Sequence, residues 1–145
     1  MIFVSSALEL EINKNIIMNN LIVDAARDKI FLTFIVGKNI YTCSHENSKI
    51  NFEKLILLIS EFLKNNKSSL DCIDAIYVNR GPGSFGGIRN SLSTIKALYL
   101  TKKIDYYCFS FNDFKDSEAI EYPDIPGLCE KYKIKKNLIN PIYLS

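Results

Sequence analysis

Histidine is nearly absent from this chain, whose 145 residues include only one, His45. A metal site built from several histidines is therefore excluded, and no metal ligand set is expected. The four cysteines form no CxxC pair, which argues against a disulfide framework and favours a reducing, cytoplasmic compartment. Two of them, Cys72 and Cys108, adjoin apolar strand-like runs and are expected to be small buried hydrophobes.

Long apolar runs and excess charge are missing too. No segment approaches the ~20 apolar residues of a membrane span, so no membrane association is expected. Residues 1–17 lack the basic and apolar regions of a signal peptide, and Met18 is an alternative start for the chain. The formal net charge of +2 disfavours a dedicated nucleic-acid binder. The length, with 48% hydrophobic residues, predicts one globular domain.

The order of the apolar runs predicts a mixed α/β sheet of five strands with helices as crossovers. Gly37 and Lys38 predict a tight hairpin turn between the second and third strands. The strand-like runs, rich in β-branched and aromatic residues, are Leu21–Val23, Ile30–Val36, Asn39–Cys43, Ile73–Val78 and Tyr106–Phe111.

Two helices are predicted, one from an N-cap at Asn51 to Leu63 and one over residues 88–101. In the first, Ile56, Leu57 and Leu63 lie off the main apolar stripe. A helix that is apolar on more than one side needs more cover than its own sheet provides, which points to a partner. Residues 112–127 are typical of an irregular connector, and residues 131–144 of an edge strand or an extended tail.

The most specific segment is the glycine-rich loop from Arg80 to Arg89, placed between a strand and a helix. Its Gly81-Pro82-Gly83-Ser84-Phe85-Gly86-Gly87 core contains the spacing of a dinucleotide fingerprint but lacks the lysine of a P-loop. Arg89 falls in the first helical turn, where we expect it to meet a carboxylate or a phosphate. A tight turn without any ligand is the competing interpretation, and these features leave both open.

The strand at residues 74–79, the loop Arg80–Arg89 and the helix after it resemble the signature of the TsaB family. The family pattern is GPGSFTGxR, and Gly86 stands where threonine is usual. Weaker likenesses follow in order: Leu21–Asp24, the His45-Glu46 pair, Ser110, and Pro141–Leu144. The resemblance implies one lobe of the actin, sugar-kinase and Hsp70-like (ribonuclease H-like) fold. Residues 18–111 would form that lobe, and residues 112–145 a connector and tail, with a second lobe largely missing.

The resemblance also implies a function without a catalytic residue in this chain. It predicts a scaffold for a TsaD-like catalytic subunit in threonylcarbamoyladenosine modification of tRNA, with a TsaE-like ATPase as a further partner and tRNA contacted only indirectly. Asp24 would be a vestigial phosphate-site residue, with no cofactor bound by this chain alone and ATP or ADP at the level of the complex. The predicted partner interface comprises Leu55, Leu58, Phe62, Leu92, Ile95 and Tyr99.

Two other functions remain open from the sequence. A homodimeric module or degenerate remnant without a tRNA role would pair the same helical face with itself. A nucleotide-dependent enzyme would use the loop Gly81–Gly87, and the missing P-loop lysine weighs against it. For the scaffold we predict that Leu58→Asp or Ile95→Asp abolishes partner binding while the domain still folds.

Overall fold

The computed structural model describes residues 18–115 and 119–143, so the segment 1–17 considered above lies outside the described residues. Five strands form one mixed sheet, as the sequence predicted, and their order in the sheet is β3-β2-β1-β4-β5. β1 pairs antiparallel with β2 and parallel with β4. The strands are β1 (Asn19–Asp24), β2 (Lys29–Val36), β3 (Asn39–Glu46), β4 (Ala75–Asn79) and β5 (Asp105–Phe109).

The strands follow from their side-chain patterns. In β2, Ile30, Leu32 and Phe34 point to one face and belong to the main apolar core, while Thr33 between them is buried on the other face, as period two requires. The hairpin turns at Gly37, whose φ of 57° suits a glycine. β3 is longer than the predicted strand, which ended at Cys43, because residues 44–46 continue its pairing with β2. Polar residues are tolerated there since β3 is an edge strand with mostly exposed side chains.

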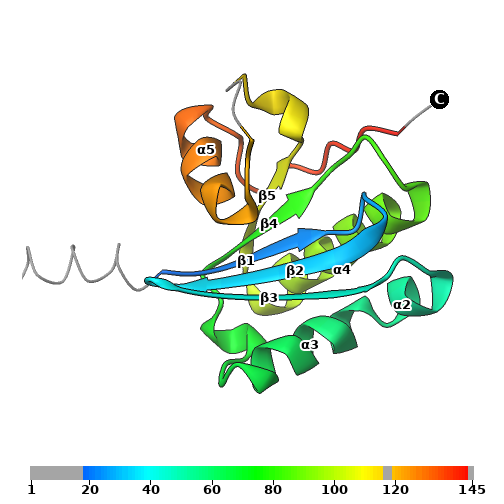
Figure 1. Cartoon of the computed structure of the whole chain (residues 1–145), viewed down its shortest axis with the longest axis vertical. Coiled ribbons are helices and arrows are strands. Elements are labelled where there is room, and N and C mark those ends of the chain that lie inside the picture. Colours follow the sequence, from blue (N-terminus) through cyan, green and yellow to red (C-terminus); the bar gives the residue numbers. More distant parts are fainter. Residues whose placement is uncertain (1–17, 116–118, 144–145) are drawn as a thin grey trace, which may run out of the picture.

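Three helices cover one face of the sheet: α2 (Lys49–Glu53), α3 (Leu55–Asn65) and α4 (Phe85–Lys102) (Figure 1). The single helix expected from Asn51 to Leu63 is therefore wrong in two respects. Ser48 caps the first helix, with its side chain accepting a hydrogen bond from the backbone N–H of Asn51. The chain then leaves helical geometry at Lys54, where φ is −114°, and restarts as α3.

The opposite face is covered by the segment after β5, which was expected to be an irregular connector. It contains the short 3-10 turns η2 (Phe111–Asp113) and η3 (Tyr122–Asp124) and the helix α5 (Ile125–Lys131). Pro126 falls at the start of α5, where a missing N–H costs no hydrogen bond. Figure 1 shows α5 across the sheet from α3 and α4. Ile125 and Cys129 of α5 pack on a second apolar cluster, so this segment completes the domain.

Two smaller expectations can be compared with the structure. Of the edge strand and the extended tail predicted after α5, the tail is observed: within the described residues it makes a single antiparallel bridge, between Lys136 and Tyr107 of β5. Cys108 is buried as predicted, but Cys72 ends the 3-10 turn η1 (Leu70–Cys72) and is exposed. All four cysteines are free thiols.

Candidate functional site

The carboxyl ends of the three parallel strands meet at one edge of the sheet. Asp24 ends β1, Asn79 ends β4, and Ser110 follows β5. In open α/β sheets this edge is where ligands usually bind. The segments that carry the TsaB resemblance therefore come together here, although they are spread along the chain.

Asp24 is fully buried and its carboxylate is surrounded by donors. It accepts hydrogen bonds from the backbone N–H of Ala26 at 3.1 Å, from Asn79 Nδ2 at 3.1 Å and from the hydroxyl of Tyr122 at 2.7 Å. Burial raises the pKa of Asp24 above its ordinary value, although these hydrogen bonds act in the opposite direction. All three donors belong to the chain itself, so most of the acceptor positions of the carboxylate are occupied.

The glycine-rich loop lies directly on the turn that follows β1. The backbone N–H of Ser84 donates to the carbonyl of Ala26 at 2.8 Å. A Cβ atom at Gly83 would collide with that carbonyl, and one at Gly87 would collide with the carbonyl of Ala25. These two glycines are thus required for contact between the loop and the chain's own backbone, which favours the tight-turn interpretation over a phosphate cradle.

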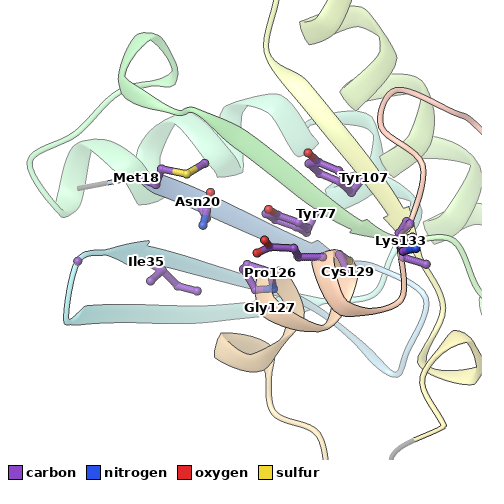
Figure 2. Close-up of a pocket in the computed structure, with 12 residues that line it drawn as sticks. Met18, Asn20, Ile35, Tyr77, Tyr107, Pro126, Gly127, Cys129 and Lys133 are labelled. Atoms are coloured by element: carbon purple, nitrogen blue, oxygen red, sulfur yellow. The ribbon is translucent and has the colours of Figure 1, made fainter. Parts of the chain in front are cut away.

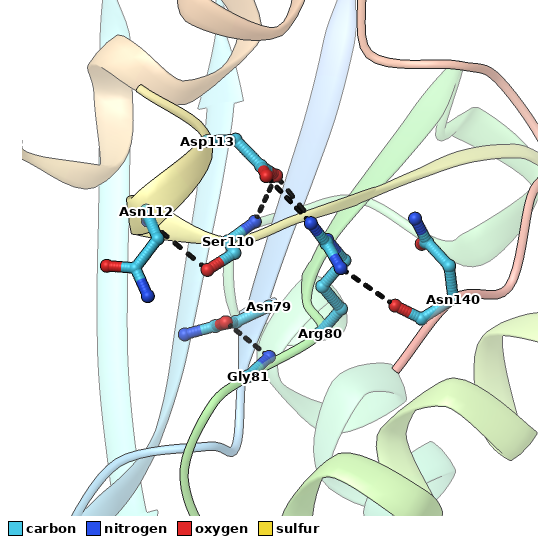
Figure 3. A network of polar contacts seen from close by, with 7 residues as sticks. All are labelled: Asn79, Arg80, Gly81, Ser110, Asn112, Asp113 and Asn140. Atoms are coloured by element: carbon cyan, nitrogen blue, oxygen red, sulfur yellow. Dashed lines mark hydrogen bonds and ion pairs between the residues drawn. The ribbon is translucent and has the colours of Figure 1, made fainter. Parts of the chain in front are cut away.

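Arg80 holds the loop to the segment after β5 (Figure 3). Its guanidinium lies 2.7 Å from one carboxylate oxygen of Asp113 in an ion pair whose side chains are 16% and 19% exposed. The other carboxylate oxygen accepts the backbone N–H of Ser110 at 2.8 Å, and Arg80 also donates to the carbonyl of Asn140. Asn79 Oδ1 accepts the N–H of Gly81 at 2.9 Å, which fixes the start of the loop.

The C-terminal tail closes over the same loop. The backbone N–H of Ile142 donates to the carbonyl of Arg80 at 2.7 Å, and Gly81 has a φ of 105° that a side chain would strain. The ring of Tyr143 packs on Phe85, with 4.8 Å between the ring centroids. Two segments that resemble the TsaB family, one in the middle of the chain and one near its C-terminus, are therefore in contact.

The remaining loop residues are more open. Pro82 and Arg89 are exposed, and Ser84 caps α4 through its hydroxyl, which accepts the N–H of Gly87. Of the carboxylate or phosphate expected near Arg89, no carboxylate is found, because this side chain makes no ion pair or hydrogen bond with any residue that the structure describes; a phosphate stays a prediction. His45 lies on β3, with its Nε2 atom 3.8 Å from the Cys43 sulfur.

The predicted partner interface needs a larger correction. Leu55, Leu58, Phe62, Leu92 and Ile95 are at most 6% exposed and pack in the core, and Tyr99 is partly buried against it. Leu63, placed off the stripe from sequence, is buried as well. The sequence pattern identified the apolar residues correctly but assigned too many of them to a partner. That these helices dock on another protein remains a prediction, but the contacts would have to be made by other side chains of the helices, which are exposed.

A cavity of about 750 Å³ opens between α5 and the sheet (Figure 2). Tyr77 and Tyr107 stack on its floor with centroids 4.9 Å apart, and burial raises the pKa of Tyr77. Burial also raises the pKa of the lining thiol of Cys129 to about 12, so at neutral pH it is protonated and a poor nucleophile. The buried Oδ1 atom of Asn20 has no hydrogen-bond partner among the residues that the structure describes. These groups do not form a catalytic arrangement.

Two further searches cover the described residues only. Within residues 18–115 and 119–143, no three His, Cys, Asp or Glu side chains converge where they could hold a metal ion. Over the same ranges, no helix combines the length and apolar character needed to cross a bilayer.

Sequence reasoning missed Asn79, Asp113 and Tyr122 as members of this site. Asp113 carried a usable signal, because Ser110 and Asp113 have the spacing of a capping box and form one in the structure. Tyr122 carried none, since its contact with Asp24 spans 98 positions of the chain.

Comparison with known proteins adds family information to this geometry. The family model for TsaD, tRNA N6-adenosine threonylcarbamoyltransferase, matches residues 45–110. The tRNA threonylcarbamoyladenosine biosynthesis protein TsaB of Buchnera aphidicola subsp. Baizongia pistaciae is 34% identical over 83 residues, 50% of this chain and 38% of that protein. The TsaB protein of Buchnera aphidicola subsp. Schizaphis graminum is 30% identical over 90 residues, 62% of this chain and 43% of that protein.

Among solved structures, YeaZ from Pseudomonas aeruginosa superimposes with a TM-score of 0.59 at 18% identity, covering 64% of this chain and 44% of that one. This likeness, with the strand order and the helices described above, defines an α/β lobe of the actin-like, ribonuclease H-like fold. Over 50 to 62% of its length the chain is similar to proteins of the TsaB family. It spans less than half the length of the curated relatives it matches.

Proposed function

We propose that this chain is a non-catalytic subunit in the threonylcarbamoyladenosine modification of tRNA. The likeness to two proteins named for the biosynthesis of that nucleoside carries the proposal. The four free thiols fit the reducing cytoplasm that such a role requires. Its partner would be a TsaD-like transferase, with a TsaE-like ATPase joining the complex and tRNA bound through the partners.

The site geometry supports a role without catalysis. The carboxylates of Asp24 and Asp113 are engaged by donors of the chain itself, and Gly83 and Gly87 are used to approach the chain's own backbone. A general acid or base needs a free position beside its substrate, and a phosphate cradle needs free loop N–H groups. We accordingly propose that this chain alone binds no cofactor and that ATP or ADP enters only in the complex.

The docking surface would use the outward sides of the helices. Ile56 and Leu57 on α3 are 42% and 59% exposed, and Leu100 on α4 is 59% exposed. The outward side of α4 also carries Ser93 and Ala97, whose small side chains permit close approach of a second helix. Exposed apolar residues on two neighbouring helices are the kind of surface that a helical partner covers.

Co-purification of this chain with the TsaD protein of the same organism tests the proposal, with chains started at Met1 and at Met18. A stable complex from either start is the expected result. A folded chain that binds no TsaD from either start would contradict it. A tight homodimer that TsaD does not exchange into, seen by sedimentation, would favour the homodimeric module instead.

A further inference from the structure

A second cavity, of about 510 Å³, lies on the α5 side of the sheet beside β2 and β3. This volume falls within the range of small-molecule sites, which is roughly 300–1,000 Å³. Its walls are mostly apolar and include Ile40, Phe111, Ile120 and Pro123. None of the family signature residues Arg80 to Arg89 lines it, but Tyr122, which donates to Asp24, does, so the cavity adjoins the site described above.

Arg27 places a fixed positive charge at this cavity. Its guanidinium carbon lies 5.6 Å from the ring centroid of Phe111 and 6.0 Å from that of Phe31. Its one hydrogen bond with a described residue is a long one, 3.4 Å to the hydroxyl oxygen of Tyr122. A guanidinium has five N–H donors, so most of them remain available to a ligand. Arg27 and the lining residue Glu121 are both exposed, and the carboxylates of Asp24 and Asp28 also act on Arg27, so a ligand anion would compete with these acidic groups.

Thr33 supplies the second observation. It lines the cavity and is only 1% exposed, yet its side chain makes no hydrogen bond with any residue that the structure describes. Its antiparallel partner Thr42, on β3, lines the cavity as well. The Thr33 hydroxyl is not one of the sealed polar atoms that lack a partner, so it keeps contact with the open cavity, where a bound polar atom would be a hydrogen-bond partner.

We propose that this cavity binds a small amphipathic anion. Its apolar body would lie against Ile40, Ile120 and Pro123, its carboxylate or phosphate would pair with Arg27, and a polar atom would meet the hydroxyl of Thr33. The guanidinium beside two aromatic rings would favour ligands with a negatively charged head group, and the apolar walls would favour ligands with an apolar body.

Isothermal titration of the full chain with four probes tests both parts of the proposal. Hexanoate and hexyl phosphate have both an apolar chain and an anionic head group. Hexanol has the apolar chain without the negative charge, and acetate has the negative charge without the long apolar chain. At least one hexyl anion should bind saturably and at least about tenfold more tightly than hexanol or acetate. The tighter of the two anions identifies the preferred head group. Absence of saturable binding by both anions would overturn the proposal, as would equal binding by hexanol.

Three variants locate the binding. Arg27→Gln should weaken binding of the hexyl anion about tenfold by removing one charge-assisted contact. Ile40→Trp, at a half-exposed position, should fill the cavity mouth and weaken binding without disturbing the fold. Arg89→Gln, which removes an exposed arginine elsewhere, is the matched control and should bind normally. Unchanged binding in both Arg27→Gln and Ile40→Trp would show that the anion binds elsewhere.

Discussion

The hydroxyl of Tyr122 lies 2.7 Å from the carboxylate of Asp24, although 98 positions separate the two residues in the sequence. Asp24 ends the first strand, and Tyr122 belongs to the segment that covers the opposite face of the sheet from α3 and α4. The contact therefore joins the edge of the sheet to its second layer. It also occupies one side of a carboxylate that would otherwise be open to a ligand.

Tyr122→Phe should lower the free energy of unfolding by about 1 to 2 kcal/mol, because a buried acceptor loses a donor. The same change should raise the pKa of Asp24 further, since the Tyr122 hydrogen bond acts to lower it. Urea denaturation at neutral pH measures the first effect. Tyr143→Phe is the control, because this side chain is 42% exposed and its ring contact with Phe85 is retained. Equal stability of the two variants would show that the Tyr122 hydroxyl contributes nothing.

Asp24→Asn should change how stability depends on pH. The folded-state pKa of Asp24 is raised above 3.8, mainly by burial, so the folded chain holds a proton that the unfolded chain has released. The stability linked to that proton is complete below pH 3.8 and is lost as pH rises through the raised folded pKa. The free energy of unfolding of the variant minus that of the wild type should therefore be highest at neutral pH. It should fall as acidification protonates Asp24 in the folded wild type. Denaturation curves at several pH values give this difference, and a constant value would contradict the assignment.

The five strands and the position of the glycine-rich loop could be predicted because their signals are local. Runs such as residues 30–36 combine β-branched and aromatic residues with period two, and the structure places a strand there. The loop was recognisable because four of the six glycines of the chain fall within seven positions, 81–87. Gly83 and Gly87 are needed there for close backbone contact, which few other residues permit.

Burial and distant contacts could not be predicted in the same way. The helical stripe through Leu58 and Ile95 has the same periodicity whether it faces the chain's own sheet or a partner, and the structure assigns it to the sheet. The helix α5 was hidden by Pro126 and Gly127, which are typical of loops. The ion pair of Arg80 with Asp113 depends on the fold, because 33 positions separate the two residues.

Asp113→Asn should destabilise the chain by about 2 to 3 kcal/mol, because it leaves the largely buried Arg80 without its counter-charge. The double variant Arg80→Met/Asp113→Asn should recover part of this loss, since the unpaired charge is then absent. Chemical denaturation of the four proteins in the cycle gives the coupling free energy. Asp71→Asn breaks the exposed pair with Lys102 and is the control, expected to cost less than about 1 kcal/mol. Similar losses for Asp113→Asn and Asp71→Asn would mean that burial adds nothing to the first pair.

Gly83→Ala should lower the free energy of unfolding by at least about 2 kcal/mol, because its Cβ would collide with the backbone carbonyl of Ala26. Gly127→Ala is the matched control. A Cβ at Gly127 meets nothing within 4 Å, and alanine should stabilise α5 by about 0.5 to 1 kcal/mol. Gly86→Thr restores the residue usual in the TsaB family and should be intermediate, since its Cβ meets only the ring of Phe52, at 3.1 Å. Thermal unfolding ranks the three variants, and any other order would contradict the packing of the loop.

Leu57→Asp should weaken binding to TsaD by at least about tenfold while the chain keeps its stability. Leu57 is 59% exposed, and an acidic residue in the first turn of α3 interacts favourably with the helix dipole. Leu138→Asp makes the same change at a leucine that is 43% exposed in the C-terminal tail, and it should bind normally.

Leu58→Asp, measured beside these two variants, distinguishes a loss of binding caused by a surface change from one caused by unfolding of the core. Leu58 is 6% exposed, so a carboxylate there would be buried without a partner and should cost about 4 kcal/mol or more. This replaces the expectation from sequence that Leu58→Asp spares the fold. Denaturation curves together with pull-down on immobilised TsaD distinguish the three variants. If Leu57→Asp binds as tightly as Leu138→Asp, the outward side of α3 does not contact TsaD, and the docking surface must be sought elsewhere on the domain.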